Sequence, residues 1–275
     1  MSKINNEKRE LHFYYKNEVK IKAQFIDAAS FLQKYKNKVD LIFTDPPFGI
    51  GGDKLDNVYN RDNNNVVKGY QEAPSKDYEE WAYEWIKHLD KALKPSGSVV
   101  IISGWTHEAD IQHAMKRTGK FELVNQLIWK FNFGVHTKRK FVTSHYVILW
   151  YCKKGAKPYF NKNAYHDDWE RKIGGGSAVY DDLQSVISID KEYRRGRLKY
   201  QNQLPSRLVE KLIKHLSEEG DLVVDPFAGS FTIPFIAMKL NRQAHGNDIN
   251  EETEQLIKTR WEEYARNKSN KNINC

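Results

Sequence analysis

The chain has 275 residues, of which 44 are Lys or Arg and 36 are Asp or Glu, so its formal net charge is +8. Seven Trp and an aromatic content of 13% exclude an intrinsically disordered chain, because such chains lack the groups needed to bury a core. No run of about 18 uncharged apolar residues is present, which excludes a membrane-spanning helix and predicts no membrane partner. The positive charge favours a polyanionic partner such as nucleic acid.

The cysteine count and the first residues indicate where the protein works. Cys152 and Cys275 are too few for a disulfide framework or a four-ligand zinc site. The N-terminal stretch MSKINNEKRELHF lacks the apolar segment of a secretory signal. The His residues show no paired metal-ligand spacing. We therefore expect no metal site and a cytoplasmic location, in the cytosol or nucleoid of a prokaryote, with both thiols reduced.

Apolar runs and helical spacings predict an alternation of strands and helices along the chain. The predicted elements are a strand at 39–44, a helix at 76–93 that a Lys-Pro-Ser-Gly stretch ends, a strand at 98–103, a helix at 106–118, strands at 121–131 and 144–152, a helix at 205–216, a strand at 221–225, a helix at 233–241, a strand at 244–249 and a helix at 251–265. Continuous apolar strands that alternate with helices predict a mostly parallel α/β sheet covered on both faces. Ligands of such sheets bind at the carboxyl ends of strands, so the residues directly after each strand are the functional candidates.

Two stretches break this alternation. Residues 49–75 are rich in Gly, Asn and Asp and show little periodicity. A long irregular run inside a compact domain is usually a lid or a binding loop. Residues 153–201 are mixed in charge and end in a basic cluster at 191–199, which predicts a small inserted subdomain.

The strand at 39–44 runs directly into residues 45–48 (DPPF). Two consecutive prolines restrict the backbone and remove two N–H donors, so the chain leaves the strand as a rigid array of acceptors, the Asp45 carboxylate and a proline carbonyl. Such an array suits an exocyclic amino group, and Phe48 offers a face on which a planar ring can stack. The alternative is a strand-ending turn with Phe48 in the core.

The strand at 221–225 runs into residues 225–230 (DPFAGS) and then into a helix. Small residues there let a ligand approach the N-terminus of that helix, as in other nucleotide sites of this architecture. Neither the dinucleotide fingerprint nor a Walker loop is present. Asp248 follows the next strand, where an acid can bind ribose hydroxyls, so a cofactor with a ribose and no required phosphate fits best. The alternative is a tight strand–helix turn capped by Ser230.

Together these residues resemble the S-adenosylmethionine-dependent amino-methyltransferases of DNA. Residues 45–48 resemble the family's catalytic motif (D/N/S)-P-P-(Y/F). Residues 225–232 (DPFAGSFT) resemble its cofactor motif DPFxGSGT, with Phe231 where a Gly is usual. A catalytic motif that precedes the cofactor motif resembles the β-ordered, circularly permuted group. The resemblance implies a Rossmann-like, mostly parallel seven-stranded sheet with a small target-recognition insert.

The same resemblance divides the chain into a catalytic half at 1–152, with a mobile loop at 49–75, a target-recognition insert at 153–199 and a cofactor-binding half at 200–275. Residues 202–205 (NQLP) resemble a segment that borders the methionine end of S-adenosylmethionine, and Asp27 resembles an acid that contacts its adenine. The implied cofactor contacts are Asp27, Asp45, Gln203, Pro205, Asp225, Phe227, Ala228, Gly229, Ser230, Thr232 and Asp248.

The resemblance implies direct methyl transfer to an amino group of a base that has flipped out of the duplex. The implied catalytic residues are Asp45, Pro46, Pro47 and Phe48. Asp45 and the Pro46 carbonyl would accept the two N–H bonds of the target nitrogen, and Phe48 would stack on the base. In the family, Asp at the first motif position goes mainly with adenine N6 and Ser with cytosine N4. Asp45 therefore implies adenine, while cytosine stays open.

Double-stranded DNA is the implied partner, and we expect its phosphates to meet three basic clusters. These are Lys54, Arg61 and Lys68, then Lys138, Arg139 and Lys140, then Arg194, Arg195 and Arg197. The short insert predicts a short target sequence. The resemblance also implies a role in a restriction–modification or epigenetic system, and homodimers are frequent in the family.

Two other functions stay open. The chain could be a catalytically silent subunit that only binds DNA, although the intact Asp45 and Asp225 argue against it. It could also methylate RNA or a protein amide, because an amide offers a similar pair of N–H donors. The net positive charge and the permuted motif order favour DNA.

Overall fold

The computed structural model describes residues 2–7, 10–15, 18–50, 72–132, 134, 138–164, 183–190 and 203–271. Their elements, in chain order, are β1 (Ser2–Glu7), β2 (Glu10–Tyr15), β3 (Glu18–Gln24), α1 (Ala28–Gln33), β4 (Val39–Thr44), α2 (Tyr78–Ile86), α3 (Leu89–Ala92), β5 (Leu93–Ser103), α4 (Glu108–Thr118), β6 (Phe121–Lys130), β7 (His145–Lys153), β8 (Val186–Ser188), α5 (Ser206–Leu216), β9 (Leu222–Asp225), α6 (Thr232–Lys239), β10 (Gln243–Asn247) and α7 (Thr253–Lys271). Within these ranges, none of the helices combines the length and the apolar character needed to cross a bilayer.

The strands form a single sheet in the order β1-β2-β3-β10-β9-β4-β5-β7-β6-β8. The five strands from β3 to β5 in this order pair in parallel, and β7 runs antiparallel between β5 and β6. The seven strands from β3 to β6 match the predicted sheet. The described residues add the β1–β2 hairpin at one edge and β8 at the other, so the expected total of seven strands is wrong.

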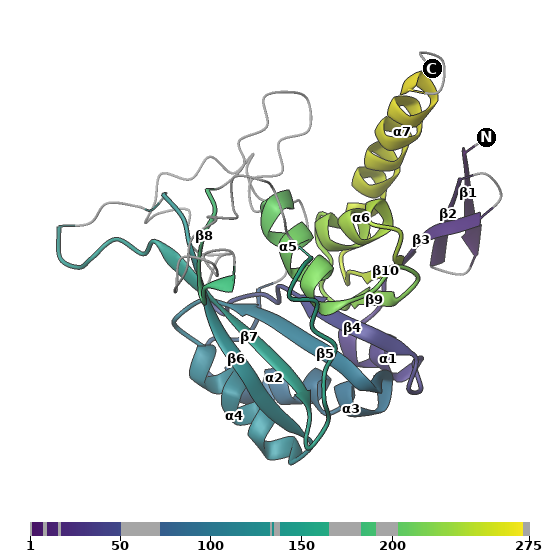
Figure 1. Ribbon diagram of the computed structural model, residues 1–275. Coiled ribbons are helices and arrows are strands. Elements are labelled where there is room, and N and C mark those ends of the chain that lie inside the picture. The colour runs from purple at the N-terminus through teal and green to yellow at the C-terminus, as the bar shows by residue number, and fades with distance from the viewer. Residues whose placement is uncertain are drawn as a thin grey trace.

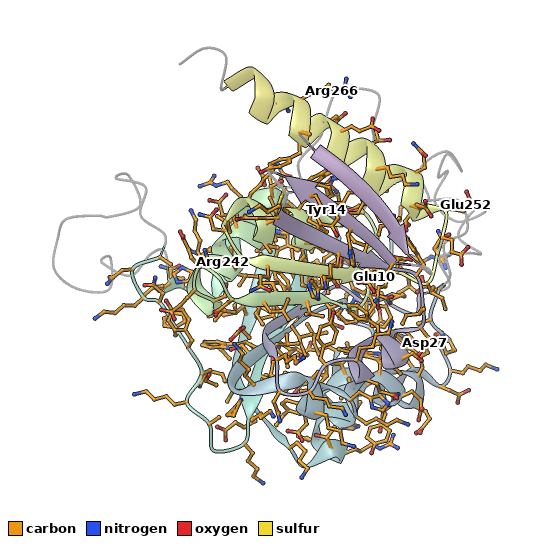
Figure 2. The ribbon with its side chains drawn as sticks, turned by 90° about the vertical axis from the view of Figure 1, so that its right-hand side faces the viewer. Glu10, Tyr14, Asp27, Arg242, Glu252 and Arg266 are labelled. Atoms are coloured by element: carbon orange, nitrogen blue, oxygen red, sulfur yellow. The ribbon has the colours of Figure 1, made fainter. Side chains whose placement is uncertain are left out.

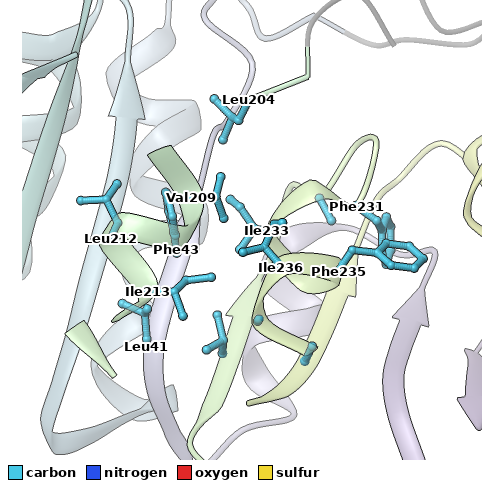
Figure 3. Packing of buried hydrophobic residues seen from close by; sticks show 14 of the residues in the cluster. Leu41, Phe43, Leu204, Val209, Leu212, Ile213, Phe231, Ile233, Phe235 and Ile236 are labelled. Carbon is cyan, nitrogen blue, oxygen red and sulfur yellow. The ribbon is translucent and has the colours of Figure 1, made fainter. Parts of the chain in front are cut away.

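Two apolar cores lie on the two faces of the sheet, because side chains of a strand alternate between faces. Leu41 and Phe43 of β4 belong to the core that contains α5, α6 and α7, whereas Ile42 belongs to the core that contains α1 to α4. Figure 1 shows the first four helices and the last three as separate groups. In Figure 3, Leu41 and Phe43 lie against α5 next to Leu212 and Ile213. The prediction of a sheet covered on both faces is confirmed.

The predicted helix at 76–93 is in fact two helices, α2 and α3, and the chain enters β5 at Leu93. The apolar spacing was informative, since Trp85, Ile86 and Leu89 are all buried. It did not show the interruption at 87–88, because both short helices place their apolar residues on the same core. The Lys-Pro-Ser-Gly stretch lies inside β5, where the pairing with β4 shifts register between Val39 and Leu41, as at a bulge.

The strands before β4 were not predicted. In β2 and β3 the apolar residues alternate with polar ones, and Leu11, Phe13, Ile21 and Ala23 are buried. That period of two is a strand signal on a sheet with one buried face. The order β2-β3-β10 then places this N-terminal meander beside the last strand of the chain, which no local pattern reveals.

The described part of the predicted insert packs on the sheet and on α5. Strand β8 pairs in parallel with β6, and the Asn161 N–H donates to the His215 carbonyl at 2.8 Å. The Phe160 ring stacks on the His215 ring with centroids 5.5 Å apart. Residues 165–182 and 191–199 of the insert lie outside the described residues, so the three-part division of the chain stays a prediction.

Candidate active site

The DPPF turn (residues 45–48) and the DPFAGS turn (residues 225–230) begin side by side. They follow β4 and β9, which pair in parallel, so their carboxyl ends meet at one edge of the sheet. The Thr44 hydroxyl donates to Asp225 Oδ1 at 2.9 Å, and both side chains are buried. Thr44 and Asp225 are 181 residues apart in the chain, and their hydrogen bond joins the end of β4, directly before the DPPF turn, to the first residue of the DPFAGS turn.

The DPPF turn is hydrogen-bonded to Tyr78, the first residue of α2. Its hydroxyl donates to the Pro47 carbonyl at 2.7 Å, and its buried ring stacks on His107 with centroids 4.3 Å apart. His107 Nδ1 lies 2.6 Å from a carboxylate oxygen of Asp110. The Pro47 carbonyl is therefore already bonded within the protein. The predicted acceptor pair, the Asp45 carboxylate and the Pro46 carbonyl, stays a prediction.

An aromatic cluster adjoins the same turn. The half-buried Phe48 ring meets the Tyr146 ring edge-on, with centroids 4.9 Å apart. The ring centroids of Phe131 and Trp129 lie 5.1 and 5.6 Å from that of Tyr146. Phe48 is neither a fully buried core residue nor an isolated surface ring, because one side of it is packed and part of it is accessible. That placement suits a platform on which a planar ligand can stack.

The DPFAGS turn is held by polar groups that follow β10. The Gly229 N–H donates to Asp248 Oδ2 and the Asn250 N–H donates to Asp248 Oδ1, each at 2.8 Å. The Ala228 N–H donates to the Asn247 carbonyl at 2.7 Å. The Gly229 N–H that we expected to face a ligand is thus used inside the protein, while the Asp248 carboxylate is fixed in orientation beside the turn.

Asn247 joins three segments of the site through its buried amide. Its Nδ2 donates to the Ile26 carbonyl at 2.8 Å and to the Pro226 carbonyl at 3.1 Å, and its Oδ1 accepts from the Ile26 N–H at 3.2 Å. The segment after β3, the turn after β9 and the end of β10 are consequently tied together at one side chain.

Phe231 occupies the position where the family motif has Gly, and its backbone conformation shows why Gly is usual there. It adopts the left-handed conformation with φ 59° and ψ 28°, which Gly accepts far more readily than other residues. Its ring is fully buried and lies against β10, where a Cβ on Gly246 would come within 2.5 Å of it. The large ring and the absent side chain at 246 are therefore complementary.

Arg260 of α7 supports the start of α6. Its guanidinium donates to the Ser230 carbonyl and, at 3.4 Å, to the Thr232 hydroxyl, and it lies 5.0 Å from the centroid of the Phe235 ring. The Ser230 hydroxyl lies 3.0 Å from the Thr232 hydroxyl. The N-cap of α6 is Phe231 without a side-chain cap, so the alternative of Ser230 as the capping residue is wrong.

The environment shifts the pKa of three Asp side chains at or near the site. Burial raises the pKa of Asp225 well above its ordinary value, and the nearby carboxylates of Asp45 and Asp248 add to this shift. Burial also raises the pKa of Asp248. For Asp27, burial acts in the same direction, but the hydrogen bonds from Ser30 outweigh it and lower the pKa. The carboxyl groups at the ends of β4, β9 and β10 thus gather hydrogen-bond acceptors at one edge of the sheet, which suits a donor-rich ligand.

Among the described residues, no group of three or more His, Cys, Asp and Glu is arranged to hold a metal ion.

Comparison with known proteins decides the family. The profile of the N6/N4 DNA methylases matches residues 39–259, which span both turns. The chain belongs to this family of DNA methylases.

Similar proteins of known name support the assignment of this DNA methylase to the family. It is 29% identical over 231 residues to the type II methyltransferase M.HpaI of Haemophilus parainfluenzae, covering 82% of this chain and 68% of that protein. It is 29% identical over 261 residues to M2.DpnII of Streptococcus pneumoniae, covering 93% and 94%. It is also 29% identical over 244 residues to the DNA adenine methyltransferase YhdJ of Escherichia coli, covering 82% and 77%.

Solved structures share the fold of the methylase. The crystal structure of the M1.HpyAVI–SAM complex superposes with a TM-score of 0.58 at 22% identity, covering 88% of this chain and 99% of that one. The PvuII DNA methyltransferase, described as cytosine-N4-specific, gives a TM-score of 0.63 at 17% identity, covering 84% and 82%. These likenesses confirm the predicted Rossmann-like methyltransferase fold.

Several predicted cofactor residues of the methylase make contacts within the protein. Asp27 is exposed at the protein surface (Figure 2) and caps α1, where its Oδ1 accepts the Ser30 N–H at 2.8 Å. The Phe227 ring packs against Trp81 and Trp85 of α2, with centroids 5.7 and 5.3 Å away. Its N–H donates to Asp225 Oδ1 at 3.1 Å. These cofactor contacts stay predictions.

The segment before α5 contributes an apolar side chain to the core on that face of the sheet. Leu204 is buried in the same core as Phe43 and Ala228, and Pro205 is the N-cap of α5. Gln203 is half-buried, so part of its amide is accessible. The predicted role of Gln203 and Pro205 beside the cofactor stays a prediction.

The predicted DNA contacts fall in two groups. Lys54, Arg61 and Lys68 and the trio Arg194, Arg195 and Arg197 lie outside the described residues. Lys138, Arg139 and Lys140 are described and exposed, between β6 and β7. The ends of the predicted lid are described too, and the Gly49 N–H donates to the Glu72 carboxylate at 2.9 Å, so both ends lie beside the DPPF turn.

Tyr78, Asn247 and Arg260 are site residues that the sequence did not reveal. Tyr78 continues the apolar spacing of α2, and this pattern predicts only a core residue. Asn247 carried a usable signal, because a polar residue at the end of a strand needs hydrogen-bond partners when it is buried. Arg260 lies in the last helix with no local signal that it contacts the DPFAGS turn.

Proposed function

We propose that this DNA methylase transfers a methyl group from S-adenosylmethionine to the N6 amino group of adenine in duplex DNA. The observation that carries the proposal is the hydrogen bond from Thr44 to Asp225, which places an amino-group acceptor turn directly beside a turn suited to a ribose-bearing cofactor. The names of two similar proteins support the reaction. One is a DNA adenine methyltransferase, and the structure of another is a complex with SAM.

The turn after β9 suits the cofactor chemically. The Asp248 carboxylate is oriented by two backbone N–H donors and keeps lone pairs for ribose hydroxyls. When bound, S-adenosylmethionine supplies an electrophilic methyl group on a cationic sulfonium. We assign its contacts to Asp27, Asp45, Gln203, Pro205, Asp225, Phe227, Ala228, Gly229, Ser230, Thr232 and Asp248.

The turn after β4 would orient the nucleophile. Asp45 and the Pro46 carbonyl accept the two N–H bonds of the target amino group, which favours a pyramidal nitrogen whose lone pair points at the methyl carbon. The bond from Tyr78 to the Pro47 carbonyl leaves Pro46 as the competent carbonyl. Asp45 also stabilises the positive charge that develops on the nitrogen. The protein contributes orientation and electrostatics to a direct transfer.

The target nitrogen is inaccessible inside a duplex, so the base must leave the stack. We propose that Phe48 stacks on the extruded adenine, and that exposed Lys138, Arg139 and Lys140 contact phosphates. The type II methyltransferases among the similar proteins favour a role in restriction and modification. Work in the cytoplasm and assembly as a homodimer stay predictions.

The test is nucleoside mass spectrometry of unmethylated duplex DNA incubated with the protein and S-adenosylmethionine. We expect N6-methyladenine from the wild type and none from Asp45→Ala, with cofactor affinity within about threefold. Asp90→Ala is the matched control, because Asp90 lies on α3, at the opposite edge of the sheet, and should keep full activity.

Each other product has a defined meaning. N4-methylcytosine would keep the mechanism and replace adenine with cytosine as the target. Cofactor binding without any methylated base would identify a silent subunit or a substrate other than DNA. Retained turnover in Asp45→Ala would remove Asp45 from the chemistry.

A further inference from the structure

The described residues of the connection between β6 and β7, which are 131–132, 134 and 138–144, project from the sheet edge that carries the DPPF turn. Figure 1 shows this segment as the teal trace that reaches outward to the left of β6 and β7. The paired residues Ser103 of β5 and Val147 of β7 place this segment at the carboxyl end of β5, and β5 runs parallel to β4. The segment therefore leaves the protein next to the proposed base-binding turn.

The base of the segment is fixed. The Phe131 N–H donates to the Ser144 carbonyl at 2.9 Å, which closes the two arms across from each other. The arms stay close farther out, because a Cβ on Gly134 would overlap the Val142 side chain and lie 2.5 Å from the Thr143 carbonyl. Through Phe131 and Tyr146, whose ring centroids lie 5.1 Å apart, this base rests on the aromatic cluster that holds Phe48.

The outer end of the segment combines an apolar ring with three positive charges. Phe141 is 99% exposed, the highest value among the large apolar side chains of the described residues. Lys138, Arg139 and Lys140 precede it directly and are all exposed. Lys140 Nζ lies 5.8 Å from the centroid of the half-exposed Trp105 ring. The exposed ring can enter an apolar environment in a partner, and the three cations beside it favour a partner with negative charge. A nucleic acid offers both, because its base stack is apolar and its backbone carries phosphates.

We propose that Phe141 is a wedge that enters the base stack of duplex DNA and fills the space left by the extruded base, while Lys138, Arg139 and Lys140 contact the adjacent phosphates. This inference rests on the proposed function and adds to it the group that holds the duplex open. Side chains such as Phe are used in this way by proteins that unstack base steps.

The reach of the segment is sufficient. Phe141 lies three residues before Ser144 at the base, and an extended chain spans roughly 3.3 Å per residue, so Phe141 can stand about 10 Å from the base. Either groove of B-DNA is about 8 Å deep. The phosphate contacts of the three cations would set the depth at which the ring enters.

The experiment compares the affinity of the full-length protein for two duplexes of about 30 base pairs, one fully paired and one with a central abasic position. Because stacking of one aromatic ring on a base changes affinity by about tenfold or more, the wild type should prefer the abasic duplex by at least that factor. Phe141→Ala should bind both duplexes equally within about twofold, and Phe141→Leu should retain most of the preference.

Two control variants separate this effect from others. Leu123→Ala removes an exposed apolar side chain at the far end of β6 and should leave the preference unchanged. A Lys138→Ala, Arg139→Ala, Lys140→Ala triple variant should weaken binding to both duplexes alike and reduce the salt dependence of binding.

The wedge is overturned if the wild type shows no preference for the abasic duplex, or if Phe141→Ala keeps it. Neither result depends on methyl transfer. A preserved preference in a protein that forms no methylated base would instead overturn the proposed function and leave the wedge in place.

Discussion

The two turns of the site follow neighbouring strands of one sheet, yet they are held in different ways. The DPPF turn after β4 is restricted by its two prolines and by one bond from Tyr78 to the Pro47 carbonyl. The DPFAGS turn after β9 is held by Asn247, Asp248 and Arg260, which all follow it in the chain. The first turn is mostly determined by its own residues, whereas the second depends on residues of β10 and α7.

This difference predicts where each turn is vulnerable. Substitutions around the DPPF turn should change the chemistry more than the stability, because the prolines keep the backbone in place. Substitutions around the DPFAGS turn should change stability and cofactor binding together, since buried backbone groups there lose their partners. Four substitutions test this comparison, in order of decreasing effect on the free energy of unfolding.

Asn247→Leu should have the largest effect. It removes three hydrogen bonds and leaves the Ile26 N–H and the carbonyls of Ile26 and Pro226 without that partner. With about 1–3 kcal/mol for each of the three buried groups left unpaired, we expect the free energy of unfolding to fall by about 3–9 kcal/mol and cofactor binding to be lost. Chemical denaturation and cofactor titration measure both. Asn125→Leu on the exposed face of β6 is the control, and an equal loss there would contradict the role of Asn247.

Phe231→Ala should destabilise the protein by about 3–5 kcal/mol, the range for truncating a buried Phe. Phe231→Gly removes the same ring but relieves a left-handed backbone that costs a non-glycine residue about 1–2 kcal/mol. Glycine should therefore be the more stable of the two, the reverse of its usual rank against alanine. Thermal unfolding of both variants checks this, and a more stable alanine variant would show that φ 59° imposes no strain.

Tyr78→Phe should lower the turnover number about tenfold while stability falls by only about 1 kcal/mol, since one hydrogen bond is lost and the ring remains. Without the hydroxyl, the Pro47 carbonyl can compete with Pro46 for the target amino group. Steady-state kinetics and thermal unfolding separate the two effects. Tyr83→Phe on the same helix should change neither, and a pure change in KM would argue against a positioning role for Tyr78.

Asp225→Asn should have the smallest effect on stability at neutral pH and should alter its pH dependence. Since burial raises the pKa of Asp225, the folded protein keeps a proton that the unfolded chain releases. The free energy of unfolding consequently falls as the pH rises from about 4 toward that raised pKa. Asparagine can still accept from Thr44 and from the Phe227 N–H, and it carries no charge.

Thermal unfolding of Asp225→Asn without cofactor, from about pH 5 to about pH 9, should therefore show a flatter profile than the wild type. Asp77→Asn is the control, because Asp77 is exposed and makes no side-chain cap bond. An unchanged slope in Asp225→Asn would mean that Asp225 does not titrate in this range.

The sequence by itself determined the succession of strands and helices along the chain from β4 onward. It also determined the two motifs and their positions directly after strands. These features are local, because periods of about two and 3.6 residues distinguish strands from helices and prolines act on their own backbone. Only the tertiary structure decided that β4 lies beside β9, so that Thr44 meets Asp225 across 181 residues. It also decided that Tyr78, Asn247 and Arg260 support the turns and that Phe231 is accommodated opposite Gly246. Such contacts depend on which strands become neighbours, and that choice is made by burial over the whole chain.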